Sequence, residues 1–154
     1  MEDTGLVKRF TLRPYTEKDE DAAIALWHRT WTQAYPAIDF DARLQAWRER
    51  WRKELVPGAR IVVAERGSAM VGFVTIDAGG YLDQLVVEPD SWGSELGDLL
   101  VAAAKDMSPT GITLLVNSDN NRAIRFYERN GFKYTHDAVN PVSGRAVRGM
   151  AWKP

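Results

Sequence analysis

The sequence of 154 residues contains no cysteine. Disulfides within the chain, thiolate nucleophiles and cysteine-based zinc sites are therefore excluded. The two histidines, His28 and His136, have no second histidine at metal-ligand spacing, and no calcium-loop pattern of Asp, Asn and Gly occurs. Any metal site would have to consist mainly of carboxylates, so we expect the protein to work without a metal.

An excess of positive charge and a long apolar run are also missing. The chain has 20 Lys and Arg against 21 Asp and Glu, a formal net charge of −1, and no dense basic block. It therefore lacks the electrostatic footprint of a nucleic-acid or anionic-membrane partner. No apolar run approaches the ~20 residues of a membrane span. Residues 1–5 are acidic and lead no hydrophobic segment, unlike a signal peptide, so we expect a cytoplasmic protein.

What is present fits one soluble domain. Hydrophobic residues make up 45% of the chain and charged residues 27%, which is typical of a soluble globular protein. The length suits one domain with a substantial core. We therefore expect a single domain over residues 1–154, in which residues 1–9 are a flexible N-terminus.

Hydrophobic periodicity and turn residues predict the order β-α-α-β-β-β-α-β-α-β-β. A helix between two apolar strands makes a βαβ unit, so the strands around Leu85 and Leu114 should lie in one sheet. The fold class is therefore α/β (α+β), with a mixed central sheet of roughly six to seven strands and about four flanking helices. The expected strands are 10–12, 60–65, 70–76, 81–87, 112–116, 132–135 and 147–152, and the expected helices are 16–35, 41–55, one that begins at 96, and 122–130.

The chain is organised around residues 85–104. The apolar run 85–87 is the end of a strand, and the turn residues of 89–93 break the extended pattern. From residue 96 the apolar residues recur with helical spacing. Free backbone N–H groups at such a helix start, together with the helix dipole, form an anion site suited to a phosphate. An ordinary strand-to-helix crossover explains the same pattern, and Glu95 places a negative charge where phosphate oxygens would lie.

A second informative stretch is residues 116–132. Here an apolar strand leads into a helix that carries Tyr127 one turn after Ala123. A tyrosine phenol can act as a general acid by donating a proton to a developing thiolate. A helix tyrosine beside Phe126 is more often a core residue, so the residues alone do not assign Tyr127 a catalytic role.

Residues 116–132 resemble the motif Asn-x-x-Ala-x-x-Phe-Tyr-x-x-x-Gly-Phe of the GNAT N-acetyltransferase superfamily. Residues 87–97 are similar to the acetyl-coenzyme A loop of the same family, with Val87-x-Pro89 at the strand exit and Gly97 at its last glycine. The predicted element order is also the family's order, so the resemblance covers nearly the full chain. The first motif is matched at Asn120, Ala123, Phe126, Tyr127, Gly131 and Phe132.

The resemblance implies an enzyme that uses acetyl-CoA as cosubstrate and moves the acetyl group to a primary amine by direct attack, without a metal or a cysteine. Tyr127 is the implied acid, which protonates the thiolate of the departing coenzyme A. The backbone of strand 85–87 would run beside the pantetheine arm, and the N–H groups of 93–98 would hold the pyrophosphate. The implied coenzyme A contacts are Leu85, Val86, Val87, Trp92, Gly93, Ser94, Glu95, Leu96, Gly97, Asp98, Asn120, Ala123, Phe126 and Tyr127.

Two residues of the loop depart from the family's pattern. Trp92 stands where the family usually has Arg or Gln, and Glu95 stands where its middle glycine belongs. A carboxylate beside a phosphate near a surface costs on the order of 1–4 kcal/mol, which is roughly one to three powers of ten in affinity. Glu95 therefore either points away from the loop or weakens coenzyme A binding.

The sequence does not identify a single residue as the base that takes the amine proton. The family often uses an acidic side chain on the central strand or a water chain, and Asp83 and Glu88 are the nearest carboxylates, each of which also fits a solvated surface charge. We assign the role to Asp83. The resemblance implies that the helical segment around residues 27–35 and the loop before Val147 form the wall of the acceptor pocket, with core packing as the alternative for the aromatic residues. The expected pocket residues are Trp27, Trp31, Tyr35 and Tyr81.

The leading hypothesis is therefore an acetyl-CoA-dependent N-acetyltransferase that acts on a small-molecule amine or a peptide, in a family in which a homodimer is common. The alternative is a GNAT-fold module that binds an acyl-CoA or a protein without turnover, which Trp92 and Glu95 suggest. A nucleotide bound in the same turn is a third and weaker alternative, because the lysine of a P-loop and the pattern Gly-x-Gly-x-x-Gly are absent.

Overall fold

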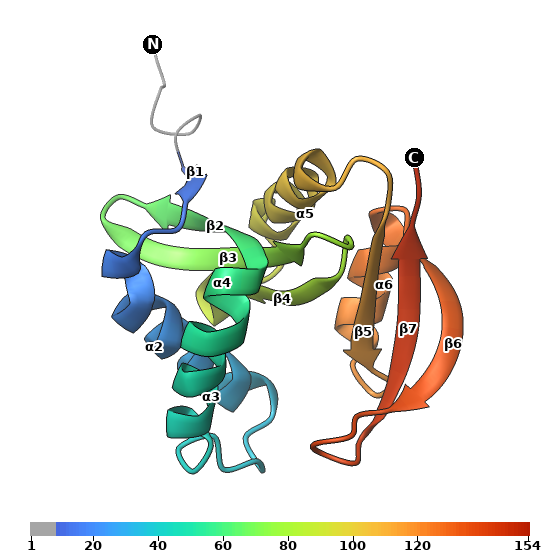
Figure 1. Ribbon diagram of the computed structural model, residues 1–154, viewed down its shortest axis with the longest axis horizontal. Coiled ribbons are helices and arrows are strands. Elements are labelled where there is room, and N and C mark those ends of the chain that lie inside the picture. The colour runs from blue at the N-terminus through green and yellow to red at the C-terminus, as the bar shows by residue number, and fades with distance from the viewer. Residues whose placement is uncertain (1–8) are drawn as a thin grey trace.

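The computed structural model describes residues 9–154, so the expected flexible N-terminus lies outside this part apart from Arg9. The element order agrees with the predicted one (Figure 1). No helix within residues 9–154 is long and apolar enough to cross a membrane. The strands are β1 (Thr11–Pro14), β2 (Ala59–Arg66), β3 (Ala69–Asp77), β4 (Leu82–Val87), β5 (Ile112–Asn117), β6 (Lys133–Val139) and β7 (Ala146–Trp152). The helices are α2 (Glu20–Ala34), α3 (Leu44–Arg50), α4 (Val56–Gly58), α5 (Leu96–Met107) and α6 (Asn121–Arg129), with short turns η1 (Glu17–Asp19), η2 (Trp51–Leu55) and η3 (Pro89–Ser91).

The strands form two antiparallel sheets, in the orders β1-β2-β3-β4 and β5-β7-β6. The sheets meet where Tyr81 pairs in parallel with Thr113, whose N–H donates to the Gly80 carbonyl at 3.0 Å. Gly80 has a φ of 82°, and a Cβ there would lie 2.6 Å from the Gly111 carbonyl oxygen, so the joint requires glycine. Beyond this bridge β4 and β5 separate, and the two sheets stand apart in Figure 1.

The strands around Leu85 and Leu114, expected in one sheet, are joined only at this bridge and belong to two sheets beyond it. β5 pairs along its whole length with β7, from Ile112 opposite Trp152 to Asn117 opposite Val147. β4 pairs with β3 on its other side. β4 and β5 thus each pair with a neighbouring strand along one edge. Beyond the bridge, the edges that they turn toward each other have no strand partner among residues 9–154.

Two hydrophobic cores cover the first sheet from opposite faces. The first lies between the sheets and helices α5 and α6, and it includes Leu96, Leu100, Ile112 and Met150. The second lies under α2 and α3 and is rich in tryptophan. Trp27 is 6% exposed, and its ring stacks on Trp47 with 4.6 Å between centroids. Trp27 is therefore a core residue. Core packing is the alternative that the sequence leaves open to its expected place in the acceptor pocket.

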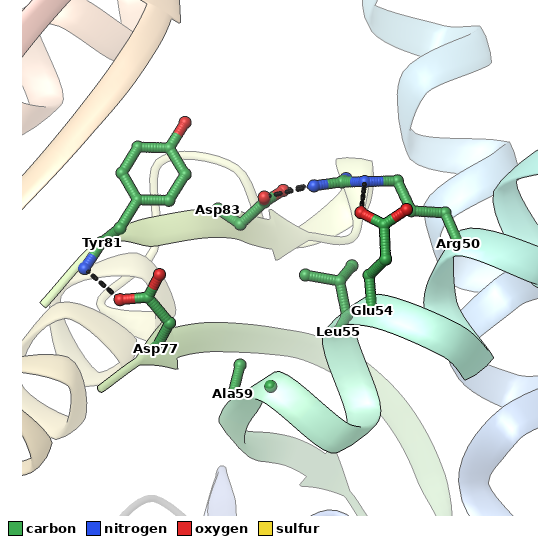
Figure 2. A pocket seen from close by; sticks show the side chains of 8 residues that line it. Arg50, Glu54, Leu55, Ala59, Asp77, Tyr81 and Asp83 are labelled. Carbon is green, nitrogen blue, oxygen red and sulfur yellow. Dashed lines mark hydrogen bonds and ion pairs between the residues drawn. The ribbon is translucent and has the colours of Figure 1, made fainter. Parts of the chain in front are cut away.

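The helix predicted over 41–55 begins later and changes its geometry. Residues 41–43 form a turn, and α3 starts at Leu44. From Trp51 to Leu55 the chain makes a π-helical turn, a form that is rare and often found at functional sites. Just before this turn, Arg50 reaches across to β4, where its guanidinium contacts both carboxylate oxygens of Asp83 (Figure 2).

The final hairpin is longer than predicted. β6 extends to Val139 rather than ending at Thr135, and β6 and β7 are joined across residues 140–145. All but one of the residues of β6 are exposed. An exposed edge strand carries no apolar alternation, so the sequence pattern could not show its length.

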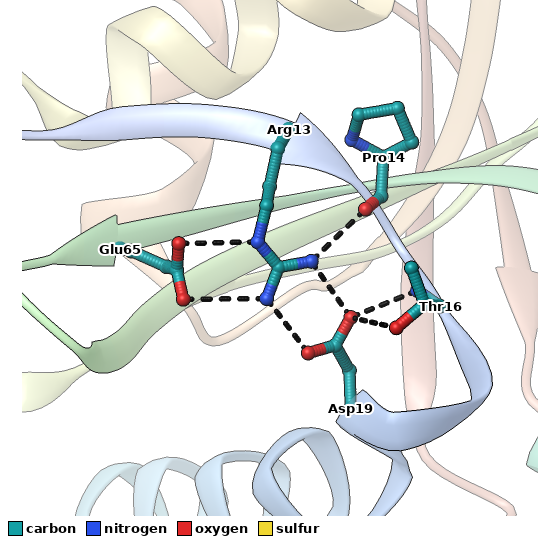
Figure 3. A network of polar contacts seen from close by, with 5 residues as sticks. All are labelled: Arg13, Pro14, Thr16, Asp19 and Glu65. Atoms are coloured by element: carbon teal, nitrogen blue, oxygen red, sulfur yellow. Dashed lines mark hydrogen bonds and ion pairs between the residues drawn. The ribbon is translucent and has the colours of Figure 1, made fainter.

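Arg13 connects the first strand, the second strand and the start of the helical layer (Figure 3). Its guanidinium donates to both oxygens of Asp19 at 2.8 and 2.7 Å and to both oxygens of Glu65 at 3.1 and 3.2 Å. The Thr16 N–H also donates to Asp19, at 2.8 Å. The hydrogen bonds from Arg13 lower the pKa of the Asp19 carboxyl from 3.8 to about 2.

This shift makes a pH-dependent contribution to stability. The folded-state pKa of Asp19 lies below its unfolded value, so the contribution is complete above about pH 4 and is lost as the pH falls toward about 2. Asp19→Asn should lower the free energy of unfolding by about 1–3 kcal/mol at pH 7. Urea denaturation of wild type and variant from pH 7 to pH 2 should show this difference shrinking in the acid range.

Asp21→Asn is the matched control. Asp21 pairs with Arg48, but its side chain is 92% exposed, and an exposed pair contributes little. The free energy of unfolding of the Asp21→Asn variant should therefore differ from that of wild type by less than about 1 kcal/mol. A difference between wild type and Asp19→Asn that does not vary with pH would contradict the role given to the Asp19 carboxylate.

Candidate active site

The open edge of β4 is the centre of the site. The Glu88 N–H donates to the Val71 carbonyl of β3 at 2.9 Å. Backbone groups alternate between the two edges of an antiparallel strand, so Val86 faces β3, whereas Leu85 and Val87 present theirs to the open edge. Val86 is buried in the aromatic core, and the other two side chains pack against the first core. The structure thus places the strand 85–87 at the gap between the sheets.

A tight turn links β4 to α5. The Trp92 N–H donates to Pro89, the Ser94 N–H to Ser91, and the Leu96 N–H to the Ser94 hydroxyl, at 3.1–3.2 Å. The other N–H groups of this turn have no hydrogen-bond partner within residues 9–154. They belong to Gly93, Glu95, Gly97 and Asp98. Free N–H groups at the positive end of the α5 dipole are an arrangement suited to an anion.

Helix α6 packs along the start of α5 through residues spaced one turn apart. The Arg122 Cζ lies 4.0 Å from the centroid of the Trp92 ring, and Asn130 Nδ2 donates to Asp98 at 3.1 Å. Between these two contacts, a Cβ at Gly97 would lie 2.8 Å from the Phe126 ring. Gly97 and Phe126 therefore set the closest approach of the two helices, and we call this row of contacts the α5–α6 seam.

Asn120 and Ala123 lie at the start of α6. Asn120 is the N-cap, and its Oδ1 accepts a hydrogen bond from the Ala123 N–H at 3.2 Å. The structure thus gives the Asn120 side chain a capping contact. Asn120 lies in the loop between β5 and α6.

Tyr127 combines a buried ring with a free hydroxyl. The residue is 8% exposed, and its ring packs edge-on between Phe126 and Phe132, with centroids 5.2 and 5.4 Å away. Its hydroxyl makes no hydrogen bond within residues 9–154 and is not among the fully enclosed polar atoms. Burial raises the pKa of Tyr127 above its ordinary value of 10, so the phenol keeps its proton at neutral pH.

The two residues that depart from the expected loop pattern behave differently. The Trp92 indole N–H donates to the Val87 carbonyl at 2.8 Å, which fixes the ring against the end of β4. Glu95 is exposed and has no ion pair or hydrogen bond from its carboxylate in the described part of the chain. The turn therefore carries an anchored aromatic ring and an unpaired negative charge.

A pocket of about 270 Å³ opens beside Tyr81 and Asp83 on the α3 side of the sheet (Figure 2). Asp83 is held by Arg50, which in turn pairs with Glu54 at 3.4 Å. Burial raises the pKa of the Tyr81 phenol. The lining residues are Arg50, Glu54, Leu55, Gly58, Ala59, Asp77, Tyr81 and Asp83.

Sequence reasoning missed Arg50, Glu54 and Asp77 in this pocket. Arg50 and Glu54 stand four residues apart on one predicted helix, which is an ordinary pattern for an exposed ion pair. Only the π-helical turn and the packing of that helix on β4 bring the pair to Asp83, so the sequence carried no signal for it.

Tyr35 lies at the other end of the gap. Its hydroxyl donates to Asp119 and accepts from Asn117 Nδ2, both at 3.1 Å. The Arg145 guanidinium lies 4.7 Å from its ring centroid and pairs with Asp119 at 2.7 Å. Trp31 stacks on Tyr35 with 5.7 Å between centroids. The end of α2 is thus joined to the loops of the second sheet. It lies away from the Tyr81 pocket.

The α5–α6 seam yields a stability prediction. Gly97→Ala should lower the free energy of unfolding by about 1–3 kcal/mol, because the new methyl group overlaps the buried Phe126 ring. In a Phe126→Leu background the overlap is removed, so the same substitution should cost much less. Urea unfolding of the four proteins in this cycle measures the coupling. An equal cost in both backgrounds would show that the seam does not constrain residue 97.

Comparison with known proteins identifies relatives with this arrangement. The family described as acetyltransferase (GNAT) domain matches residues 25–153. The peptidyl-lysine N-acetyltransferase YjaB of Salmonella typhimurium is 30% identical over 125 residues, which cover 80% of this chain and 83% of that protein. YjaB of Escherichia coli is 30% identical over 127 residues, which cover 81% and 83%.

Solved structures share the fold. The solution structure of apo-form YjaB from Escherichia coli superposes with a TM-score of 0.75 at 25% identity, over 93% of this chain and 97% of that one. The PaiA N-acetyltransferase of Thermoplasma acidophilum, solved in complex with coenzyme A, gives a TM-score of 0.75 at 20% identity, over 94% and 99%. The expected mixed α/β fold is thereby confirmed.

Proposed function

The chain belongs to the acetyltransferase (GNAT) family, and on that premise we propose that it transfers the acetyl group of acetyl-CoA to a primary amine by direct attack of the amine. One observation carries the proposal. Within residues 9–154 the Tyr127 hydroxyl has no hydrogen-bond partner, although its ring is packed in the first core, against which Leu85 and Val87 of β4 also pack. A structural tyrosine of this burial normally finds a hydrogen-bond partner, so we infer that its partner is a substrate.

The residues present fit coenzyme A. The unpartnered N–H groups between Gly93 and Asp98 would donate to the pyrophosphate, and the backbone groups of Leu85 and the N–H of Val87 would bind the amide groups of the pantetheine arm, since the Val87 carbonyl already accepts from the Trp92 indole. When bound, acetyl-CoA supplies an activated acetyl group as a thioester.

Tyr127 acts as the general acid in this proposal. Its phenol donates a proton to the sulfur that leaves, which avoids the release of a free thiolate. The raised pKa keeps the donor protonated throughout the neutral range. The packing of Phe126 and Phe132 against the ring fixes the direction of the hydroxyl.

The amine side of the reaction is assigned to the pocket of Tyr81 and Asp83. Three carboxylates line it against one guanidinium, which favours a cationic amine over an anionic acceptor. The Arg50 guanidinium contacts both carboxylate oxygens of Asp83 and fixes the position of this side chain at the pocket. We therefore propose that Asp83 attracts and orients the ammonium group, and that a proton leaves through water.

We propose a lysine side chain of a peptide or protein as the acceptor, because the curated relatives at 30% identity are named peptidyl-lysine N-acetyltransferases. The test is incubation with acetyl-CoA and lysine peptides whose N-terminus is blocked, followed by mass spectrometry. Acetylated lysine is expected in a time-dependent reaction. Acetylation of small amines without any peptide product would overturn the peptide acceptor and keep the enzyme.

Tyr127→Phe separates catalysis from binding. The ring packing is retained and only the proton donor is lost, so turnover should fall by about 10²-fold or more. The Kd for acetyl-CoA, measured by calorimetry, should stay within about two-fold of wild type. An unchanged rate would remove Tyr127 from the mechanism, and a large change in Kd would assign it to binding instead.

A second candidate function is a GNAT-fold module that binds an acyl-CoA or a protein without turnover. The unpaired charge of Glu95 at the anion site is the observation that favours it. Glu95→Gly should tighten acetyl-CoA binding by roughly ten-fold or more if the carboxylate only weakens the site. Absence of binding at millimolar ligand in both proteins would favour the non-catalytic module.

A further inference from the structure

Arg122 is a charged residue of the α5–α6 seam. Neither the sequence motifs nor the comparisons assign it a function. Phe126 and Asn130 follow it at one-turn intervals and contact Gly97 and Asp98. Since these neighbours contact the start of α5, Arg122 is carried to the same end of that helix. There its guanidinium stacks on Trp92, directly before Gly93.

The stacking partner is itself fixed. The Trp92 indole donates to the Val87 carbonyl at 2.8 Å, so the ring cannot rotate without losing this bond. The distance of 4.0 Å between the Arg122 Cζ and the ring centroid lies within the range of a cation–π contact. Stacking holds the plane of a guanidinium while its N–H groups remain free at the rim.

No acceptor uses these N–H groups. Within residues 9–154 the Arg122 side chain makes no ion pair and no hydrogen bond, and the titratable neighbours that act on it are the phenols of Tyr35 and Tyr127. Partial desolvation lowers the pKa of the guanidinium, and no carboxylate opposes this effect. A held, uncompensated cation beside unpartnered backbone N–H groups is an arrangement suited to an anion.

We infer that Arg122, held on the Trp92 ring, supplies the positive charge of the phosphate site at the start of α5. Trp92 brings no positive charge to this turn, so the charge comes from the facing helix instead. The inference rests on the proposed use of coenzyme A, whose pyrophosphate is the anion.

Calorimetric titration with coenzyme A tests this assignment. Arg122→Leu should raise the Kd about 10- to 100-fold, the effect of losing a charge-assisted contact. Arg125→Leu is the matched control, since Arg125 lies on the same helix, is exposed and has no side-chain contact with the turn. Its Kd should stay within about two-fold of wild type, and circular dichroism should show that both variants are folded.

Three further readouts separate a phosphate contact from a structural role. Raising NaCl from about 50 to about 500 mM should weaken coenzyme A binding to wild type more than to Arg122→Leu, because a charge contact is screened. Arg122→Lys should recover part of the affinity, since a point charge without the planar fork remains. Trp92→Leu should weaken binding less than Arg122→Leu, and the double variant should be no worse than Arg122→Leu alone.

Equal affinities of Arg122→Leu and Arg125→Leu would overturn the inference while leaving the proposed function intact. An equal salt dependence of wild type and Arg122→Leu would do the same, because the loss would then be structural. Absence of coenzyme A binding by wild type at millimolar ligand would overturn the proposed function, and the inference with it. The two failures are therefore distinguishable in one set of titrations.

Discussion

The site depends on a single backbone bridge. Tyr81 and Thr113 hold the two sheets together at one point, and Gly80 allows the close approach that this point requires. Every further pair between β4 and β5 would close the edge on which Leu85 and Val87 present their polar groups. The separation of the sheets is therefore what creates a binding site, and the antiparallel pairing of β5 with β7 keeps that separation from destabilising the fold.

The second constraint is the seam between α5 and α6. The absence of a side chain at Gly97 lets the Phe126 ring lie against the start of α5. Tyr127 follows Phe126 on the same helix. In the proposed mechanism, the acid that meets the thioester and the site that holds the distant phosphates are therefore positioned by one helix-helix contact. A change at Gly97 would affect both ends of the ligand.

Sequence reasoning predicted much of the architecture because it rests on local signals. The element order, the helix of Tyr127 and the turn at Gly93 follow from periodicity and turn chemistry. Local signals alone do not predict the separation of the two sheets, because pairing depends on which edges remain open in the folded chain. The ion pair of Arg50 with Asp83 was hidden for a similar reason, since a π-helical turn and a neighbouring strand create it.

The distribution of charge across the gap gives the site a direction. On the α5 side, backbone N–H groups and Arg122 favour an anion, although Glu95 opposes them. On the α3 side, carboxylates outnumber the single guanidinium of Arg50 and favour a cation. A polyanionic cosubstrate and a cationic amine would each find the opposite side unfavourable. The two ligands are thereby directed to enter from different sides of the gap, and the open edge of β4 is where an acetyl group and an amine would meet.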